Sequence, residues 1–410
     1  MAIILSINSG SSSVKVSIYK SSSSSSPTQL ADAQISGLTA PPAKLSYQCG
    51  TENIKNQEVK DVSSNEDACN KILDHLVHDK GLTEISSRDD ITHACHRVVH
   101  GGDYPAAHII DEDTFHHLED LTDLAPLHNS AALAIVRSCI KALPKAKNIA
   151  FFDSSFHSTI PEAVRTYPID PMVAKKNKLR KYGFHGISYE FIIRSVADFL
   201  GKRQEDTSII ALHLGSGASA CAILNGKSLD NSMGLTPLAG LPGATRSGSV
   251  DPSLIFHFTH DAGKPSRSST KDMHISEAEE ILNKQSGWKA LTGTTDFGHI
   301  ASSADPACKL AFDVFVDRLL GYVGSYYVAL GGRVDALVFA GGIGEKATGL
   351  RDTIGGRVRC LGFDIDDRKN SMDIKDVVQD IGRQGAKHQM LVCQTDEQFE
   401  MARQCAATKL

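Results

Sequence analysis

Apolar residues along the chain gather in short runs that predict buried strands, and two of these runs end in matching turns. The first run leads into residues 8–13 (NSGSSS), after which residues 14–18 alternate between apolar and polar side chains. The same pattern returns near the middle, where an apolar run leads into residues 215–219 (GSGAS) and then into the apolar run 220–224. Strand, small-residue turn and returning strand predict a β-hairpin. Because the two copies lie about half the chain apart, they indicate two domains related by duplication.

Strands and helices are predicted in both halves of the chain. Further apolar runs predict strands at residues 148–152, 336–340 and 389–393. Apolar residues at helical spacing predict helices at residues 131–142, 190–200, 307–330 and 397–407. Strands that are followed by helices favour an α/β fold class. The polar stretches 21–27 and 261–271 are interpreted as surface loops that carry no chemistry.

Length and composition narrow the class of protein. At 410 residues the chain is too long for one core, so two domains are expected. A net charge of −5 leaves no basic excess for nucleic acid, and no apolar run reaches the roughly 20 residues that span a bilayer. The first residues lack the basic leader of a signal peptide, and the nine cysteines form no C-x-x-C pair. We therefore expect a cytoplasmic protein with reduced thiols and neither nucleic acid nor membrane as a partner.

Three turns of glycine and serine follow predicted strands, which favours a phosphate-rich nucleotide as ligand. The turn at 8–13, with Lys15 just after it, could wrap an anion with successive N–H groups, although a plain serine-rich turn has the same composition. It is not a Walker A loop, because G-x-x-x-x-G-K-[ST] is absent. Residues 215–220 fit G-x-G-x-x-A but lead into a strand instead of a helix, so a Rossmann site is rejected. The third turn, at 341–345, follows a predicted strand and precedes a segment that could be helical.

Basic side chains stand beside glycines at three places, which would let an anionic ligand approach them closely. These are residues 96–102 (HRVVHGG), 181–186 (KYGFHG) and 243–248 (GATRSG). Arginine suits bidentate recognition of a carboxylate or phosphate. His93, His96 and His100 resemble a metal cluster, but their position in an apolar strand favours structural histidines.

Two carboxylates come directly after predicted strands. Asp153 follows the strand at 148–152, the usual position of site residues in α/β sheets. Glu397 follows the last strand, where Thr395 and the acids after it could equally form a helix N-cap. Magnesium prefers a few oxygen ligands together with water and phosphate, so one or two such acids would be enough.

In combination these motifs resemble the acetate kinase family, within the acetate and sugar kinase, Hsp70 and actin superfamily. The resemblance runs from Asn8 to Arg403. It rests on the motifs NSGSSS at 8–13, HRVVHGG at 96–102, LAPLHN at 124–129, YGFHG at 182–186, TRSG at 245–248 and GIGE at 342–345. It implies two actin-like (ribonuclease H-like) domains of duplicated topology, with the active site in the cleft between them. The expected domains are residues 1–155 with the returning helix 397–410, and residues 156–396.

The resemblance also implies a role for individual residues. The group expected around the phosphoryl in transfer, or treated as catalytic, is Asp153, His185, Arg246, Arg97 and His128. Arg97 would bind the substrate carboxylate, next to an apolar pocket of Val99, Leu127, Phe184 and Pro237. Mg²⁺, or Mn²⁺ in its place, would be held by Asn8 and Glu397. The ATP or ADP site would be lined by Ser12, Lys15, His213, Leu214, Gly215, Ser216, Gly217, Asp296, Phe297, Gly298, Gly342, Ile343, Gly344, Glu345 and Lys346.

The implied reaction is reversible phosphoryl transfer between ATP and acetate, giving acetyl phosphate and ADP. Acetate is ionised near neutral pH and needs no general base, so catalysis should consist of charge compensation and alignment. On this ground Asp153 is expected to orient Mg²⁺ or its waters and not to remove a proton. A homodimer is implied by the family alone.

Two positions depart from the family pattern, and alternatives stay open. Ser216 stands where most bacterial relatives have Asn, and Gly298 where they usually have Arg, so the choice of nucleotide is in question. Propionate or butyrate could replace acetate, and pyrophosphate could replace ATP. A non-catalytic, chaperone-like nucleotide-binding protein of the same superfamily is the alternative from another class. It would have no use for Arg97, His185 and Arg246 together.

Overall fold

The protein divides into two compact units. A computed structural model describes residues 2–10, 12–22, 26–121, 126–259, 263–267, 269 and 275–408. The first unit comprises residues 1–155 and 396–410, and the second comprises residues 156–395. Compared with the expected domains, the structure assigns only Asp396 differently, to the first unit.

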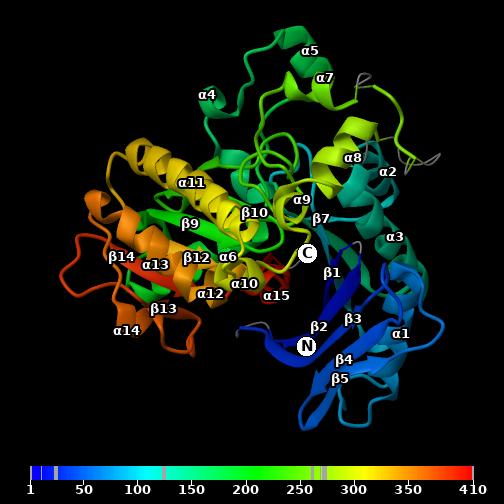
Figure 1. Ribbon diagram of the computed structural model, residues 1–410. Helices are drawn as coiled ribbons and strands as arrows, with labels where there is room; N and C mark the ends of the chain where they lie inside the picture. Colours follow the sequence, from blue (N-terminus) through cyan, green and yellow to red (C-terminus); the bar gives the residue numbers. More distant parts are fainter. Residues whose placement is uncertain are drawn as a thin grey trace. The chain divides into compact units, whose positions relative to one another are not determined.

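The first unit combines a mixed sheet with a few helices (Figure 1). Its strands are β1 (Ala2–Ser9), β2 (Ser13–Ser21), β3 (Thr28–Ser36), β4 (Lys44–Cys49), β5 (Glu52–Glu58), β6 (His93–Val98), β7 (His108–Ile109) and β8 (Lys147–Phe152). Its helices are α1 (Asn65–His78), α2 (Glu112–Asp120), α3 (Pro126–Ala142) and α15 (Glu397–Thr408), with a 3₁₀ turn at Arg88–Asp90.

The sheet of the first unit has the strand order β5-β4-β3-β2-β1-β6-β8-β7. Strands β1, β6 and β8 run parallel, whereas β2 to β5 form antiparallel hairpins. Alternate residues of β1, among them Leu5 and Ile7, enter a core that also takes up apolar side chains of α1 and α3. Helix α15 packs against β1, β2 and β6. The last helix of the chain is thereby joined to the first strand.

The second unit has its own mixed sheet and more helices (Figure 1). Its strands are β9 (Ile209–Leu214), β10 (Ala218–Leu224), β11 (Lys227–Asn231), β12 (Ala336–Ala340), β13 (Val378–Asp380) and β14 (Gln389–Cys393). Its helices are α4 (Glu162–Arg165), α5 (Pro171–Lys176), α6 (Gly186–Phe199), α7 (Leu254–Thr259), α8 (Glu277–Lys284), α9 (Gly287–Thr292), α10 (Phe297–Ser302), α11 (Pro306–Ala329), α12 (Gly341–Lys346), α13 (Thr348–Arg357) and α14 (Asp367–Asn370). Turns of 3₁₀ helix occur at Gln204–Asp206 and Arg359–Leu361, and another, Ser155–Thr159, begins at the last residue of the first unit's N-terminal segment.

The strand order of the second unit repeats that of the first. It is β11-β10-β9-β12-β14-β13, with β9, β12 and β14 parallel and β10 and β11 antiparallel. The segment β11-β10-β9-β12-β14 thus corresponds to β3-β2-β1-β6-β8. A core of apolar side chains lies between the sheet and α11, which packs against β9 and β10, and α6 packs against β9, β13 and β14. The repeated topology agrees with the duplication that the two matching hairpins predict.

Both predicted hairpins are confirmed, and several element boundaries are corrected. β10 runs antiparallel to β9, which confirms the rejection of a Rossmann site. Helix α6 begins at Gly186 and not at Glu190, because its first turn is buried and shows no polar face. Helix α3 begins at Pro126, in keeping with the preference of proline for the first helical turn. The third glycine turn is itself a short helix, α12, which low glycine propensity had concealed.

Two further expectations concern the surface and the cysteines. Among the described residues, no helix is long and apolar enough to cross a membrane. All nine cysteines are free thiols, and only Cys360 is exposed. Residues 23–25 of the serine run, and 261–262, 268 and 270–271 of the second polar stretch, lie outside the described residues.

Candidate functional site

Four predicted site residues meet at one edge of the sheet in the first unit. Asn8 lies near the end of β1, Arg97 near the end of β6, and Asp153 directly after β8. Because these strands are parallel, their carboxyl ends share one edge, where α/β proteins usually bind ligands. Glu397 joins them as the first residue of α15, the helix packed on β1. The topology thus assembles side chains that are almost 400 positions apart.

Arg97 is the centre of this group. Its Nε and Nη2 atoms donate to the two carboxylate oxygens of Asp153 at 3.0 and 2.7 Å, a bidentate pair. Its Nη1 atom donates to Asn8 Oδ1 at 3.2 Å and lies 3.3 Å from Glu397 Oε2. Asn8 Nδ2 donates to the same Glu397 oxygen at 3.0 Å.

The group is largely buried and carries more negative than positive charge. The exposed fractions of the Arg97, Asp153 and Glu397 side chains are 19%, 1% and 13%. Burial alone would lower the pKa of Arg97, but the charges of Asp153 and Glu397 outweigh it and raise that pKa. Burial raises the pKa of Glu397 despite the opposing charge of Arg97. One guanidinium faces two carboxylates, so the group lacks one positive charge.

This charge imbalance fits a divalent cation. Asn8 and Glu397 supply the amide and carboxylate oxygens that Mg²⁺ accepts. Within the part of the chain that the structure describes, no cluster of three or more His, Cys, Asp or Glu side chains could hold a metal. A magnesium ion here would therefore depend on water and phosphate oxygens for its remaining ligands, as is usual in nucleotide sites.

The raised pKa of Glu397 predicts whether removal of its charge raises or lowers the stability of the protein. A carboxyl whose pKa is raised by folding costs stability where it is ionised. Glu397→Gln should therefore have a higher Tm than the parent protein at pH 8 without added metal. The difference should shrink as the pH falls through the raised pKa of Glu397 and be gone below about 4, where this carboxyl is protonated in the unfolded chain as well. Calorimetry across this pH range measures it. A lower Tm at pH 8 would show that Glu397 stabilises the fold as an ion-pair partner.

The segment after β6 carries Val99 and is fixed by buried hydrogen bonds. The amide of Asn129 accepts from the N–H of His100 at 2.9 Å and donates to its carbonyl at 3.0 Å. Gly101 N donates to Ser154 Oγ at 3.1 Å, and a Cβ on Gly101 would lie 2.3 Å from the Phe152 ring. Val99 is half-buried in this segment. The backbone beside Arg97 is therefore tied both to α3 and to the residue after Asp153.

The other predicted residues of the first unit show less organisation. Lys15 stands opposite Asn8 in the β1–β2 hairpin, and its half-exposed Nζ lies 3.7 Å from Asp32. Ser12 is exposed in the turn. The side chains of Leu127 and His128 lie outside the described residues. His96, interpreted as structural, bonds Asn148 through Nε2 at 2.9 Å, but its Nδ1 has no partner among the described residues, and burial lowers its pKa to about 4.

In the second unit, three segments lie together at the carboxyl end of β9. They are the β9–β10 turn, the start of α12 and the loop that carries Arg246. The β9–β10 turn holds Gly215 to Gly217, and Gly341 begins α12 directly after β12. Gly341 has φ of +74°, and a Cβ there would lie 2.7 Å from Leu214 O. Arg246 lies over the same turn, with Nη1 only 2.9 Å from where a Cβ of Gly217 would be. Glycine at these positions permits the close approach.

The loop that carries Arg246 is firmly anchored. Ala244 N donates to Ser216 O at 2.8 Å, which ties the loop to the β9–β10 turn. Thr245 Oγ1 donates to Asn283 O at 2.8 Å, and Ser247 N donates to Leu282 O at 2.9 Å, which tie it to α8. Arg246 Nη1 also lies 3.5 Å from the carbonyl of Pro237, a buried residue. The hydrogen bonds of the neighbouring residues therefore hold the loop in place, and the loop positions the Arg246 guanidinium at the β9–β10 turn.

His185 and His213 lie together close to that turn. His185 precedes α6 in a left-handed conformation, φ +60°, and His213 belongs to β9. Their rings stack with centroids 4.2 Å apart. His185 Nδ1 is 2.8 Å from Ser219 Oγ, and His213 Nδ1 is 2.7 Å from Ser188 Oγ.

The side chains of several predicted nucleotide-site residues are buried or cap a helix, so their backbone groups are better placed than their side chains to contact a nucleotide. Leu214 and Phe297 are at most 5% exposed and belong to the core. Phe184, which was predicted for the apolar substrate pocket, is also buried. The Asp296 carboxylate caps α10 by accepting from the N–H groups of Gly298 and His299. In α12, Gly344 is buried, Ile343 is half-buried, and Gly342 and Lys346 are exposed. Burial raises the pKa of Glu345, the remaining charged residue of α12.

Sequence reasoning assigned no role to the side chains that position these residues. Arg351, only 1% exposed, donates to the carbonyls of Gly344 and Glu345 and so holds the end of α12. Ser219 and Tyr189 are both fully buried and bond each other next to His185. The spacing in the sequence could have indicated that Tyr189 lies near His185, since it stands one helical turn after it. That signal was hidden because the helix was predicted to start only at Glu190.

Comparison with known proteins matches nearly the whole chain. The family model described as the acetokinase family covers residues 3–403. The protein is 57% identical to a probable acetate kinase of Neurospora crassa, over 98% of this chain and 93% of that protein. A propionate kinase from Francisella tularensis superposes with a TM-score of 0.85 at 33% identity, covering 98% of both chains. The acetate kinase of Porphyromonas gingivalis superposes with a TM-score of 0.83 at 32% identity, also over 98% of both. On the strength of this end-to-end match, the chain belongs to the acetokinase family.

Proposed function

We propose that this protein transfers a phosphoryl group between ATP and acetate, with Arg97 as the receptor for the acetate carboxylate. The observation that carries this role is the arrangement around the guanidinium. Arginine has five N–H groups, of which the hydrogen bonds to Asp153 and Asn8 use three. Two N–H groups remain without a hydrogen bond among the described residues, although Nη1, which carries one of them, also forms the ion pair with Glu397 at 3.3 Å. Two N–H groups are what a carboxylate accepts in a bidentate pair.

The reaction needs alignment and charge compensation. A carboxylate oxygen of acetate forms a bond to the γ-phosphorus, and the bond from that phosphorus to the bridging oxygen of ADP breaks. No proton moves, because acetate is already ionised. Asp153 fixes Arg97 through both carboxylate oxygens, which presents the guanidinium in one orientation. The hydrogen bonds that the structure describes for the Asp153 side chain are thus with Arg97, and an additional role in orienting Mg²⁺ stays a prediction.

In the second unit, Arg246 and His185 are the groups we assign to the phosphoryl. Arg246 supplies positive charge at the β9–β10 turn, where Gly215 to Gly217 and the glycines of α12 leave backbone open to the phosphates of ATP. Mg²⁺ would be held by Asn8 and Glu397 and would neutralise phosphate charge. Because the Arg97 group alone is net negative, binding of the acetate anion should become more favourable once this cation is present.

Trapping of the acyl phosphate tests the function. Purified protein, ATP, Mg²⁺ and hydroxylamine are incubated with acetate, propionate or butyrate in parallel, and the hydroxamate is measured. Acetate is expected to give the highest kcat/KM. Higher kcat/KM with propionate would support the activity named for the Francisella tularensis structure instead. Parallel reactions with pyrophosphate and with EDTA test the phosphoryl donor and the metal, and product formation in EDTA would contradict the role of Mg²⁺.

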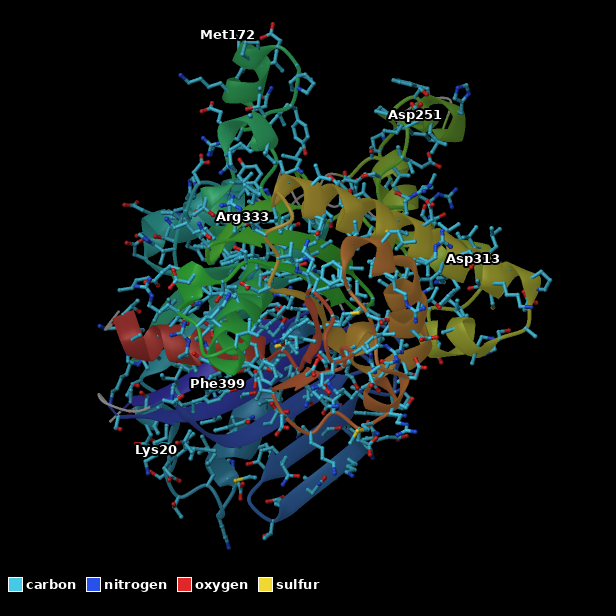
Figure 2. All side chains as sticks on the ribbon, turned by 90° about the vertical axis from the view of Figure 1, so that its left-hand side faces the viewer. Lys20, Met172, Asp251, Asp313, Arg333 and Phe399 are labelled. Atoms are coloured by element: carbon cyan, nitrogen blue, oxygen red, sulfur yellow. The ribbon has the colours of Figure 1, made fainter. Side chains whose placement is uncertain are left out.

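We also propose that two copies of the chain associate through the second unit. Met172 on α5 and Phe256 on α7 are apolar yet 76% and 68% exposed. Figure 2 shows Met172 and Asp251, three residues before α7, on two separate projections of that unit. Light scattering should give twice the chain mass of 44.1 kDa, falling to the single mass in Met172→Lys/Phe256→Lys. A single mass for the parent protein would contradict the dimer.

A further inference from the structure

A chain of buried hydroxyl groups leads to the imidazole of His185. Ser219 Oγ lies 2.8 Å from His185 Nδ1 and 2.6 Å from the hydroxyl of Tyr189. The bond to Ser219 is the hydrogen bond that the structure describes for the Tyr189 hydroxyl. Ser219 and Tyr189 are both 0% exposed, so water does not replace any of these bonds. The three side chains come from the residue before α6, from α6 itself and from β10, and they belong to a single compact unit.

The order of donors and acceptors along this chain follows from the buried hydroxyl of Tyr189. This hydroxyl carries one hydrogen, and the acceptor described for it is the Ser219 oxygen. The Tyr189 O–H is then available for Ser219, and the Ser219 O–H for His185 Nδ1. In the reverse order, Tyr189 would accept from Ser219 and its own buried hydrogen would lose the partner it has in Ser219, which is unfavourable. The favoured order makes Nδ1 of His185 an acceptor.

The stacked ring of His213 acts in the same direction. At a centroid separation of 4.2 Å, two protonated imidazoles would repel each other strongly in a partly buried setting. At most one of the two rings is therefore charged near neutral pH. His185 is the ring whose Nδ1 already accepts a hydrogen bond from a hydroxyl with no other acceptor described for it.

We propose that Ser219, oriented by Tyr189, is a positioning residue that holds His185 as the neutral imidazole with its proton on Nε2. The role of this proton in catalysis rests on the proposed function, in which His185 faces the phosphoryl group. There the Nε2–H donates a hydrogen bond to a phosphoryl oxygen and neither takes up nor releases a proton, as suits a reaction in which none is transferred. His185 is thereby a fixed hydrogen-bond donor and not an acid or a base.

The histidine ring nitrogens can be observed directly by NMR. The protein is labelled with ¹⁵N in its histidine rings, and His185 is identified as the signal lost in His185→Gln. At pH 7 the intact protein should show His185 as the neutral Nε2–H tautomer, from its two-bond ¹⁵N–¹H correlations. An Nδ1–H tautomer or a doubly protonated ring at pH 7 would overturn the proposal. This result does not depend on activity. It therefore shows whether the hydrogen bonds from Tyr189 through Ser219 set the His185 tautomer, even if the reaction itself has been assigned wrongly.

Substitutions then test whether Ser219 is the cause. Ser219→Ala should broaden or split the His185 signals through tautomer exchange and lower kcat about tenfold, with KM for ATP changed less than threefold. Ser219→Thr keeps the hydroxyl and should restore the single tautomer. The matched control is Ser188→Ala, which removes the neighbouring hydroxyl that serves His213 and should leave the His185 tautomer unchanged. Should Ser219→Ala fail to fold, Tyr189→Phe serves in its place. An unchanged His185 spectrum in both variants would refute the proposal that Ser219 and Tyr189 hold the tautomer of His185.

Discussion

Arg97→Gln is expected to lower kcat/KM for acetate by about 10²–10⁴, while KM for ATP changes little. Two charge-assisted hydrogen bonds to the carboxylate are lost, each worth about 1.5–3 kcal/mol, and each 1.4 kcal/mol is a factor of ten in rate. The same change leaves Asp153, 1% exposed, without its bidentate partner. We therefore also expect the first unit to lose about 3–5 kcal/mol of unfolding free energy. Steady-state kinetics and urea denaturation measure the two effects.

A second substitution separates the loss of activity from the loss of stability. In Arg97→Gln/Asp153→Asn the buried carboxylate is replaced by a neutral amide that can bond the glutamine. This double variant should recover most of the stability and none of the activity toward acetate. Recovery of activity with stability would mean that Arg97 only supports the fold, and the assignment of the carboxylate receptor would be wrong.

Arg246→Ala is expected to lower kcat by about 10³ or more, with smaller changes in the KM values for acetate and ATP. Arginine side chains that stabilise the charge of a transferring phosphoryl contribute about 10³–10⁵ in rate in other phosphoryl-transfer enzymes. Since the loop is anchored through the backbone of Ala244 and Ser247 and the side chain of Thr245, the substitution should leave its path unchanged. Rapid-quench measurement of a single turnover reports on the chemical step.

The control for this variant is another arginine of the same unit. Arg318 on α11 is exposed and pairs with Asp317, so Arg318→Ala should change kcat less than twofold. Added guanidinium should restore part of the activity of Arg246→Ala, because it replaces the lost charge without a covalent bond. If kcat falls less than tenfold, or if only the KM for ATP rises, Arg246 binds the ground state and does not stabilise the transition state.

The hairpins were predictable because their signals are local. The turns at 8–13 and 215–219 are short, and the flanking strands are apolar on at least one face. The apolar pattern of each strand therefore ends where the glycine and serine residues of the turn begin. Strand β12 was predictable as well, since all five of its residues are buried. Strand β5 was not, because its burial pattern contains only one half-buried residue, Ile54, and β4 supplies its hydrogen bonds. An edge strand of this kind has no signal in its own sequence.

For the site, the sequence could indicate which residue types belong together but not how they contact one another. Asp153 was recognised from its position after a strand, yet its pairing with Arg97 depends on the order β1-β6-β8. Glu397 was ambiguous, and the structure assigns the N-cap to Asp396, whose side chain accepts from Phe399 N. Glu397 itself bonds Asn8, 389 positions away. Contacts of this range arise from topology, which the family resemblance implied and the residue pattern alone did not.

The central claim is that the protein moves the γ-phosphoryl of ATP onto acetate, and ³¹P NMR of the reaction tests it most directly. Purified protein is incubated with ATP, Mg²⁺ and acetate, and the phosphorus signals are followed in time. The account predicts that the γ-phosphate signal declines while signals of acetyl phosphate and ADP grow together, and that neither grows when acetate is left out. Growth of inorganic phosphate from the outset, independent of acetate, would show an ATPase and contradict the account.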